Sequence, residues 1–252
     1  MNTEHVTFPG AHGALLAARL DTPDSPARAH VLFAHCFTCS KDIFAASRIA
    51  QALVEHGIAV LRFDFTGLGH SEGEFASTNF SSNVQDLAAA AGWLRDHRQA
   101  PALLVGHSLG GAAVLAAAAD IPEVRAVATI AAPSDVTHVT GLFREHVPEI
   151  EARGEALVQL AGRPFRIRRE FLADAAEQRL REKIAALGRA LLILHSPTDD
   201  TVGIGNATGI FVNARQPKSF VALPDADHLL RRHSDAVYAA NVIAAWSERY
   251  LP

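Results

Sequence analysis

Short apolar runs recur along the chain, and each is followed by a loop and then by a stretch with helical periodicity. The runs are continuous rather than alternating, which is the pattern of strands that are covered on both faces. Their alternation with helices predicts an α/β fold with a mostly parallel central sheet and helices on both faces. We expect strands at residues 31–34, 59–65, 102–105, 124–131, 190–194 and 220–223, and helices at 42–56, 79–98, 109–119 and 233–249.

Two segments depart from this rhythm. Residues 6–8 and 15–20 are strand-like with no helix between them, which predicts an antiparallel hairpin at one sheet edge. Residues 134–188 separate the fourth and fifth strands, and we interpret 149–160 and 173–187 within them as helices. So long an insertion at the carboxyl edge of a sheet is more typical of a lid than of a plain pair of surface helices. We expect one domain, 1–252, with a helical lid at about 134–188.

The composition narrows the class of protein. The 252 residues include 23 basic and 27 acidic side chains, a formal net charge of −4, and the chain has no basic arm. This charge disfavours nucleic acid as a partner. We find no apolar run long enough for a transmembrane helix and no apolar core of a signal peptide near Met1. We therefore expect a cytoplasmic protein with no membrane partner.

The strongest local motif is Gly106-His107-Ser108-Leu109-Gly110, between a predicted strand and a predicted helix. A nucleophile elbow requires this context. The serine sits on a sharp turn in an unfavourable backbone conformation, and side chains two residues before and after it would collide. Gly106 and Gly110 remove those side chains, which leaves Ser108 exposed above the sheet edge. The alternative is a glycine-rich turn with a bystander serine.

A serine nucleophile needs a histidine base and a carboxylate that orients the base. Two acids, Asp199 and Asp200, follow the strand at 190–194, and His228 follows the last strand. His233 lies too far into the final helix to compete well with His228. No histidine pair has metal-ligand spacing with a third ligand nearby, so we expect no metal and no other cofactor.

With these motifs, the chain resembles the serine hydrolases of the α/β-hydrolase fold over nearly its whole length. The acid loop of that family, laid over residues 195–203, selects Asp199 rather than Asp200, and Ala226-Asp227-His228 fits the histidine context. The loop at 64–73 also resembles a family loop. The resemblance implies that the oxyanion hole is formed by the amides of Phe37 and Leu109. Cys36 replaces the usual glycine, which makes a left-handed backbone there less easy.

Cys36 and Cys39 form a C-x-x-C pattern in the predicted oxyanion loop. Two partly buried thiols beside the active site are the favoured interpretation, and a thioredoxin-like redox pair is the alternative. A metal site would need two further ligands. Cysteines at this place also resemble those of hydrolase domains fused to an OsmC-like domain. That resemblance implies a possible association with such a partner.

The resulting hypothesis is a carboxylesterase-like serine hydrolase that acts on a small-molecule ester, with thioester, amide, peptidase and perhydrolase chemistry left open. The alternatives are a thiol redox protein and a non-catalytic binding protein on a hydrolase scaffold. Arg163, Arg166, Arg168 and Arg169 fit a solvated face better than an anion-selecting rim. We list four candidates for an apolar acyl pocket: Phe37, Phe143, Phe165 and Phe171.

Overall fold

The computed structural model describes residues 1–251, and in them an eight-stranded sheet has the order β1-β2-β4-β3-β5-β6-β9-β10. Six strands of this sheet run parallel, namely β3, β4, β5, β6, β9 and β10. Strands β1 and β2 pair antiparallel with each other, and β2 is antiparallel to β4. This confirms the predicted edge hairpin and the mostly parallel sheet. The strands are β1 (Asn2–Pro9), β2 (Leu15–Thr22), β3 (Ala29–Ala34), β4 (Ile58–Phe63), β5 (Leu103–His107), β6 (Ala126–Ile130), β9 (Ala190–His195) and β10 (Lys218–Ala222).

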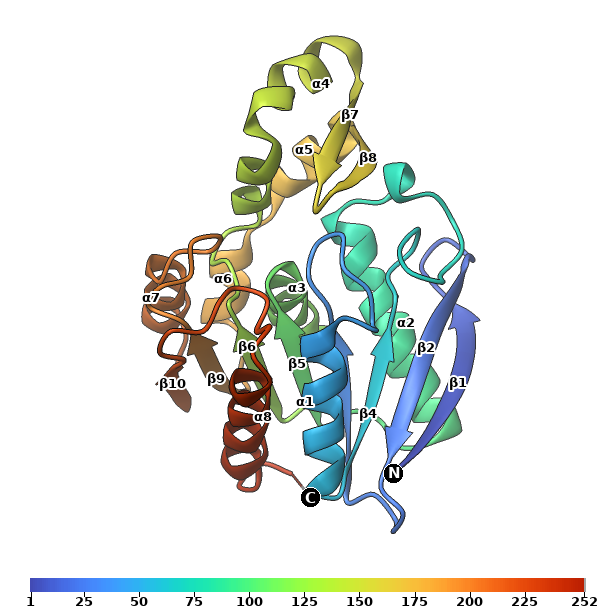
Figure 1. Cartoon of the computed structure of the whole chain (residues 1–252), viewed down its shortest axis with the longest axis vertical. Helices are drawn as coiled ribbons and strands as arrows, with labels where there is room; N and C mark the ends of the chain where they lie inside the picture. The colour runs from blue at the N-terminus through green and yellow to red at the C-terminus, as the bar shows by residue number, and fades with distance from the viewer. Residues whose placement is uncertain (252) are drawn as a thin grey trace.

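Helices cover both faces of the sheet, as the continuous apolar runs predicted (Figure 1). In β3, Val31 and Phe33 pack in the cluster with α1 and α8, while Leu32 between them packs in the cluster with α2 and α3. Successive side chains of a strand point to opposite faces, so both sets must be apolar. The core helices are α1 (Phe44–Glu55), α2 (Phe80–His97), α3 (Leu109–Ala117), α7 (Gly205–Asn213) and α8 (His233–Ser247), with short 3₁₀ turns η1 (Phe75–Ser77) and η2 (Ala118–Asp120).

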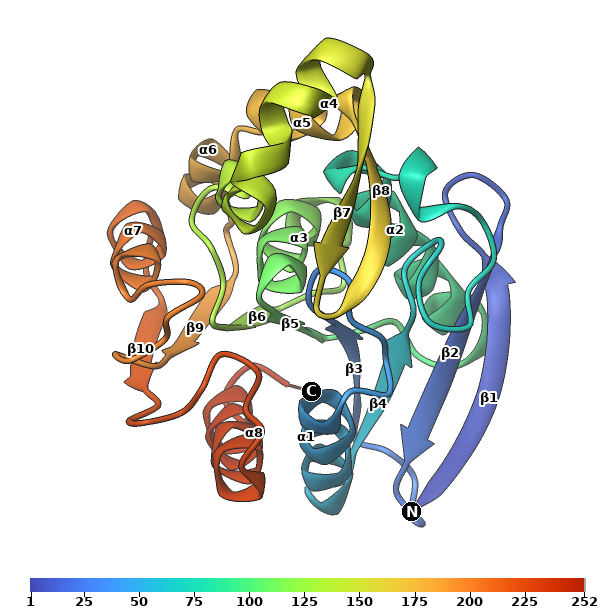
Figure 2. The same ribbon diagram turned by 45° about the horizontal axis from the view of Figure 1, so that its top comes forward.

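The segment between β6 and β9 stands over the carboxyl ends of the parallel strands (Figures 1 and 2). We call it the lid. It comprises η3 (Val136–His146), α4 (Val147–Arg153), β7 (Glu155–Leu160), β8 (Arg163–Arg168), α5 (Arg169–Glu177) and α6 (Leu180–Ala185).

Our prediction of a helix at 149–160 is wrong. Helix α4 ends at Arg153 because Gly154 adopts a left-handed conformation, with φ of 88°, and β7 then pairs with β8 as an antiparallel hairpin. Ala161 and Gly162 close this hairpin, with φ of 49° and 75°. Two central residues with positive φ suit a tight hairpin turn. Alternate residues of β7 are buried, a period of two rather than 3.6.

No helix within residues 1–251 has the length and apolar character needed to cross a bilayer. The predicted absence of a membrane partner stays a prediction.

Candidate active site

Ser108 lies at the sharp turn between β5 and α3, where its backbone has φ of 54° and ψ of −123°. A Cβ on Gly106 would lie 2.3 Å from the carbonyl oxygen of Gly110, and a Cβ on Gly110 would lie 2.4 Å from that of Ala34. Both distances are far inside van der Waals contact, so only glycine fits at either position. The Ser108 amide donates to the Ile130 carbonyl at 2.8 Å, which ties the turn to β6.

The structure brings His228 and Asp199 to this serine. His228 lies in the loop after β10, and its Nε2 is 3.0 Å from the Ser108 Oγ. Its Nδ1 is 2.8 Å from the Asp199 Oδ2, in the loop after β9. Asp199 is buried, whereas Asp200 is exposed. The geometry therefore selects Asp199 as the carboxylate beside the histidine.

The second oxygen of Asp199 is held by backbone amides. Its Oδ1 accepts from the amides of Val202 at 2.8 Å and Thr201 at 2.9 Å. Burial works to raise the pKa of Asp199, but the hydrogen bonds from His228 and from these amides outweigh it and hold the pKa below its ordinary value. The ionised carboxylate accepts from the His228 Nδ1–H, so the lone pair of Nε2 faces the serine hydroxyl.

Two neighbouring histidines stay neutral. The Nε2 of His107 donates to the His228 carbonyl at 2.7 Å, and the Nε2 of His195 donates to the Val202 carbonyl at 2.6 Å. Burial, together with the charge of His228, lowers the pKa of His107 to about 3. Burial also lowers the pKa of His195. Through these hydrogen bonds both residues hold the loops of the site in place.

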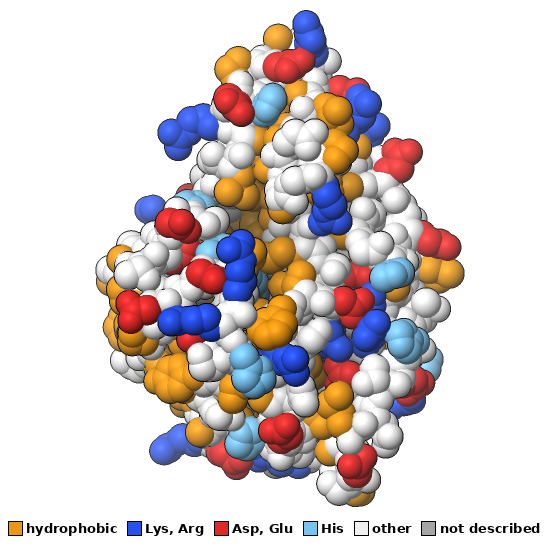
Figure 3. All heavy atoms as spheres, viewed as in Figure 1, with side chains coloured by type: hydrophobic (Ala, Val, Ile, Leu, Met, Phe, Trp, Pro, Cys, Tyr) orange, Lys and Arg blue, Asp and Glu red, His pale blue; other side chains and the backbone are white. Residues whose placement is uncertain are grey.

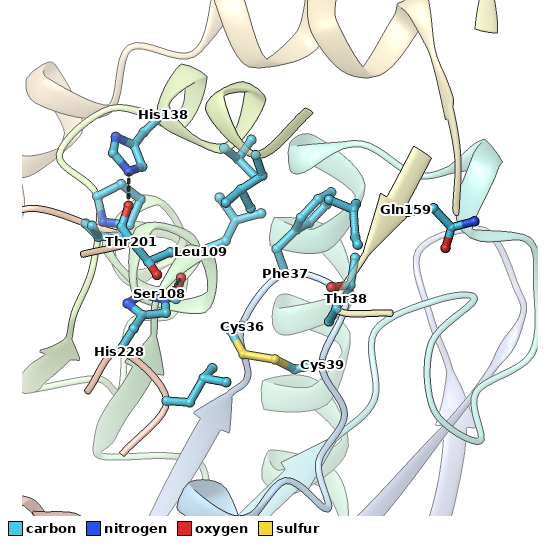
Figure 4. A pocket seen from close by; sticks show the side chains of 17 residues that line it. Cys36, Phe37, Thr38, Cys39, Ser108, Leu109, His138, Gln159, Thr201 and His228 are labelled. Carbon is cyan, nitrogen blue, oxygen red and sulfur yellow. Dashed lines mark hydrogen bonds between the residues drawn. A yellow bond between two sulfur atoms is a disulfide. The ribbon is translucent and has the colours of Figure 1, made fainter. Parts of the chain in front are cut away.

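Phe37 and Leu109, the predicted oxyanion donors, line the same cavity as Ser108 (Figure 4). In the described part of the chain, neither amide donates to another protein group. Cys36, at the place of the family's glycine, does not adopt a left-handed backbone, and Thr38 carries a positive φ of 60° instead. Two N–H groups without a protein partner beside a serine can accept a developing negative charge.

Cys36 and Cys39 form a disulfide, so our favoured interpretation of two free thiols is wrong. We call residues 36–40 the cystine loop. Before it, His35 donates through Nδ1 to the Cys36 carbonyl at 2.8 Å and accepts at Nε2 from the Phe65 amide at 3.3 Å. Beyond it, Lys41 is anchored by Asp64, which accepts from the Lys41 amide at 2.6 Å and from its Nζ at 2.8 Å.

The Lys41–Asp64 pair is buried, with side chains 3% and 0% exposed. A buried charge pair requires further hydrogen bonds to offset its desolvation, and Asp64 also accepts from the His70 amide at 2.9 Å. The guanidinium of Arg62 donates to the Lys41 carbonyl. These anchors were not predicted. The sequence feature that pointed to them was the glycine-containing loop at 64–73. In the structure Gly69 passes so close to Asp64 that a Cβ on it would lie 2.2 Å from the Asp64 carboxylate.

A cavity of about 330 Å³ opens above Ser108 and His228, between the core and the lid. Apolar side chains gather in this hollow on the molecular surface (Figure 3). Its apolar wall includes Leu109, Val139, Leu142, Leu160, Val202 and Leu229.

Of the four phenylalanines that we proposed for the cavity, Phe37 alone lines it. Phe143 and Phe171 pack beside it instead, with ring centroids 6.5 Å and 5.5 Å from the Phe37 ring. Phe75 contacts Phe37 at 5.6 Å and Phe165 at 4.8 Å. These aromatic rings join the lid to the cystine loop rather than forming an acyl pocket.

The arginines of β8 fit the predicted solvated face. Arg166 and Arg168 both pair with Glu155 across the hairpin, and Phe165 and Ile167, which alternate with them along β8, are buried. Arg163 differs, because its guanidinium donates to the Thr38 carbonyl in the cystine loop. The anion-selecting rim is therefore not supported, and one of the arginines instead contacts the site.

Comparison with known proteins identifies the family. Residues 25–166 match the serine aminopeptidase S33 family. A crystal structure of the esterase domain from a Rhodothermus marinus protein covers 100% of both chains, at 49% identity and a TM-score of 0.82. The chain is an α/β-hydrolase enzyme of the serine hydrolase class. It belongs to the S33 family.

Curated relatives carry hydrolase names. The mitochondrial palmitoyl-protein thioesterase ABHD10 of Rattus norvegicus is 32% identical over 185 residues, which are 71% of this chain and 59% of that protein. A monoacylglycerol lipase of Mycolicibacterium smegmatis is 28% identical over 138 residues, which are 54% of this chain and 48% of that protein. This chain thus spans about half to three fifths of the length of these relatives.

Proposed function

We propose that the chain is a serine esterase that works through an acyl-enzyme, with Ser108 as nucleophile, His228 as base and Asp199 as the residue that orients the base. The observation that carries this proposal is the hydrogen-bonded row from the Ser108 Oγ through His228 to Asp199, at 3.0 and 2.8 Å, on the wall of an apolar cavity. A non-catalytic binding protein would have no need of this row or of a serine in a strained turn.

The reaction begins when the Ser108 Oγ attacks a carbonyl carbon and the His228 Nε2 takes its proton. The amides of Phe37 and Leu109 donate to the oxyanion, and one such donor typically contributes about 2.7–4 kcal/mol to the transition state. Asp199 stabilises the imidazolium, which then protonates the leaving alkoxide or thiolate. Water, deprotonated by His228, releases the acyl group from Ser108.

The cavity favours a short to medium acyl chain. At about 330 Å³ it is near the lower end of the range for small-molecule sites, and its wall is mostly apolar. The relatives' names include an esterase domain, a palmitoyl-protein thioesterase and a monoacylglycerol lipase, which support oxygen and thiol leaving groups alike. We therefore propose carboxylic esters and thioesters as the substrate class.

A matched panel tests this proposal. Acetyl, butyryl, octanoyl and palmitoyl chains are each offered as an ester and as a thioester, and kcat/KM is measured for every compound. We expect a maximum at butyryl or octanoyl, and we expect Val139→Phe, which narrows the cavity, to move it toward shorter chains. Failure to hydrolyse any of the eight compounds would overturn the proposal.

Cytoplasmic location and association with an OsmC-like domain stay predictions. The rat relative is named as mitochondrial, and no comparison above includes an OsmC-like partner.

A further inference from the structure

The Cys36–Cys39 disulfide lies in the wall of the same cavity as Ser108 and His228 (Figure 4). Both of its residues line that cavity, but they are unequally accessible. Cys36 is 4% exposed, whereas Cys39 is half-buried. A compound that enters the cavity therefore meets a disulfide as well as a serine, and Cys39 is the more exposed of the two cysteines.

We propose that this disulfide is a second reactive site, at which a small dithiol that enters the cavity undergoes thiol–disulfide exchange. The dithiol's thiolate attacks the Cys39 Sγ, a new S–S bond forms, and the bond between the two cysteines breaks, so that Cys36 leaves as a thiolate. The second thiol of the ligand then attacks its own sulfur in the mixed disulfide and releases Cys39. The ligand leaves as a cyclic disulfide, oxidised by the two electrons that reduce the cysteine pair.

The fold around the cystine loop does not depend on this bond. His35 before the loop and Lys41 after it are anchored by hydrogen bonds to Phe65, Asp64 and Arg62, all outside the loop. A bridge between residues three apart in sequence closes a short ring, and short rings restrict the unfolded chain least. Exchange should therefore free residues 36–40 and leave the sheet intact.

Breaking the disulfide would nevertheless change the conformation of the loop that carries one proposed oxyanion donor. Phe37 and Thr38 lie inside the ring that the disulfide closes, and Thr38 holds a positive φ of 60° that a non-glycine residue rarely adopts. Without the bridge, the loop keeps the turn from the Cys39 amide to the Cys36 carbonyl, at 3.1 Å, the hydrogen bonds of His35 and Arg163 to the Cys36 and Thr38 carbonyls, and the packing of Phe37. This consequence rests on the proposed function, because it requires the Phe37 amide to bind the oxyanion.

The test uses dithiothreitol on the native protein. Samples taken over time are alkylated with N-ethylmaleimide, and mass spectrometry counts the adducts on Cys36 and Cys39 while octanoyl ester hydrolysis is followed in parallel. We expect both cysteines to be alkylated while the protein remains folded by circular dichroism. We also expect kcat to fall about tenfold, because a displaced oxyanion donor weakens transition-state binding, and oxidised glutathione to restore it. The double variant Cys36→Ser with Cys39→Ser should have a low rate that dithiothreitol does not change.

Single variants locate the attacked sulfur. Cys36→Ser leaves Cys39 as the free thiol, and Cys39→Ser leaves Cys36. We expect the Cys39 thiol to react with 5,5′-dithiobis(2-nitrobenzoate) about tenfold faster, because thiol reactivity follows access as well as pKa.

The outcomes separate the two proposals. Alkylation only after denaturation overturns the exchange site, whatever the hydrolysis rate, and full reduction with unchanged kcat overturns its link to hydrolysis. Native reduction of a protein that hydrolyses no ester supports the exchange site and contradicts the proposed function.

Discussion

The nucleophile elbow, which contains Ser108, and the cystine loop line the same cavity, and each supplies one of the two proposed oxyanion donors. The elbow is held by backbone: glycines with no room for a Cβ, and an amide bonded to β6. The cystine loop is held by side chains, namely a disulfide, the Phe37 ring cluster and Arg163 from the lid. Backbone packing leaves the elbow a single conformation, whereas side-chain contacts can be removed one at a time.

This difference indicates which residues of the site can be changed to alter the rate without loss of the chemistry or the fold. A change at the elbow should destroy either the chemistry or the fold, whereas a change at the loop should scale the rate and preserve both. The contacts of Phe37 with Phe143 and Phe171 connect the loop to the lid.

The largest expected effect is on the triad at the elbow. Ser108→Ala should lower kcat by about 10⁴-fold or more, because Ser108 is the one hydroxyl among the described residues that hydrogen-bonds to the His228 ring. Asp199→Asn should lower kcat by about 10⁴-fold, since an amide no longer fixes the histidine tautomer. The matched control is Asp200→Asn, at an exposed position, which should change kcat less than twofold. Equal losses from both asparagine variants would contradict the assignment of Asp199.

The rigidity of the elbow can be tested through stability. Gly106→Ala places a Cβ 2.3 Å from the Gly110 carbonyl oxygen, and we expect a loss of about 3 kcal/mol in the free energy of unfolding. The control is Gly92→Ala in α2, where nothing lies within 4 Å of the new Cβ and a gain of up to about 1 kcal/mol is expected. Urea unfolding measures both. If Gly106→Ala were as stable as Gly92→Ala, the elbow would not be the rigid element described above.

A smaller effect is expected at the cystine loop. Arg163→Ala removes the donor to the Thr38 carbonyl, and because this arginine is exposed we expect about 1 kcal/mol in the transition state, a fivefold lower kcat. Arg166→Ala, which removes only a pair with Glu155 on the hairpin, is the control and should leave kcat unchanged. A loss confined to KM, or one shared by both variants, would mean that Arg163 does not position the loop.

The smallest effect concerns the pH dependence of stability. Burial lowers the pKa of His107 from 6.5 to about 3. At pH values between these two, His107 binds a proton in the unfolded chain but not in the folded chain. Stability should therefore fall as pH drops from about 6.5 toward 3. His107→Gln should remove about 1 kcal/mol of the loss between pH 7.5 and 5.5, measured by urea unfolding at both values. His12→Gln at an exposed position is the control, and a parallel loss in all three proteins would contradict the buried neutral histidine.

The sheet, the elbow and the order of Ser108, Asp199 and His228 were predictable because each rests on local patterns. Continuous apolar runs require cover on both faces, and two glycines around a serine indicate a turn too tight for side chains. Because parallel strands end at one edge of the sheet, residues after β5, β9 and β10 are brought together even though they are far apart in sequence.

Other features depended on contacts that local patterns do not encode. The hairpin at 155–168 turns through Ala161-Gly162 rather than a typical asparagine-glycine pair, so its turn signal was weak. Sequence spacing could not decide whether Cys36 and Cys39 are bonded, because that depends on the loop conformation. The Lys41–Asp64 pair joins segments 23 residues apart, and the inward direction of Lys41 is visible only in three dimensions.

The most direct test of the central claim is covalent labelling of the wild-type protein with a fluorophosphonate, followed by peptide mapping. If His228 activates Ser108, the phosphonyl group will be found on Ser108, and both His228→Ala and Asp199→Asn will slow labelling strongly while Asp200→Asn labels like wild type. Labelling of another residue, or labelling of Ser108 at the same rate in His228→Ala, would contradict the account.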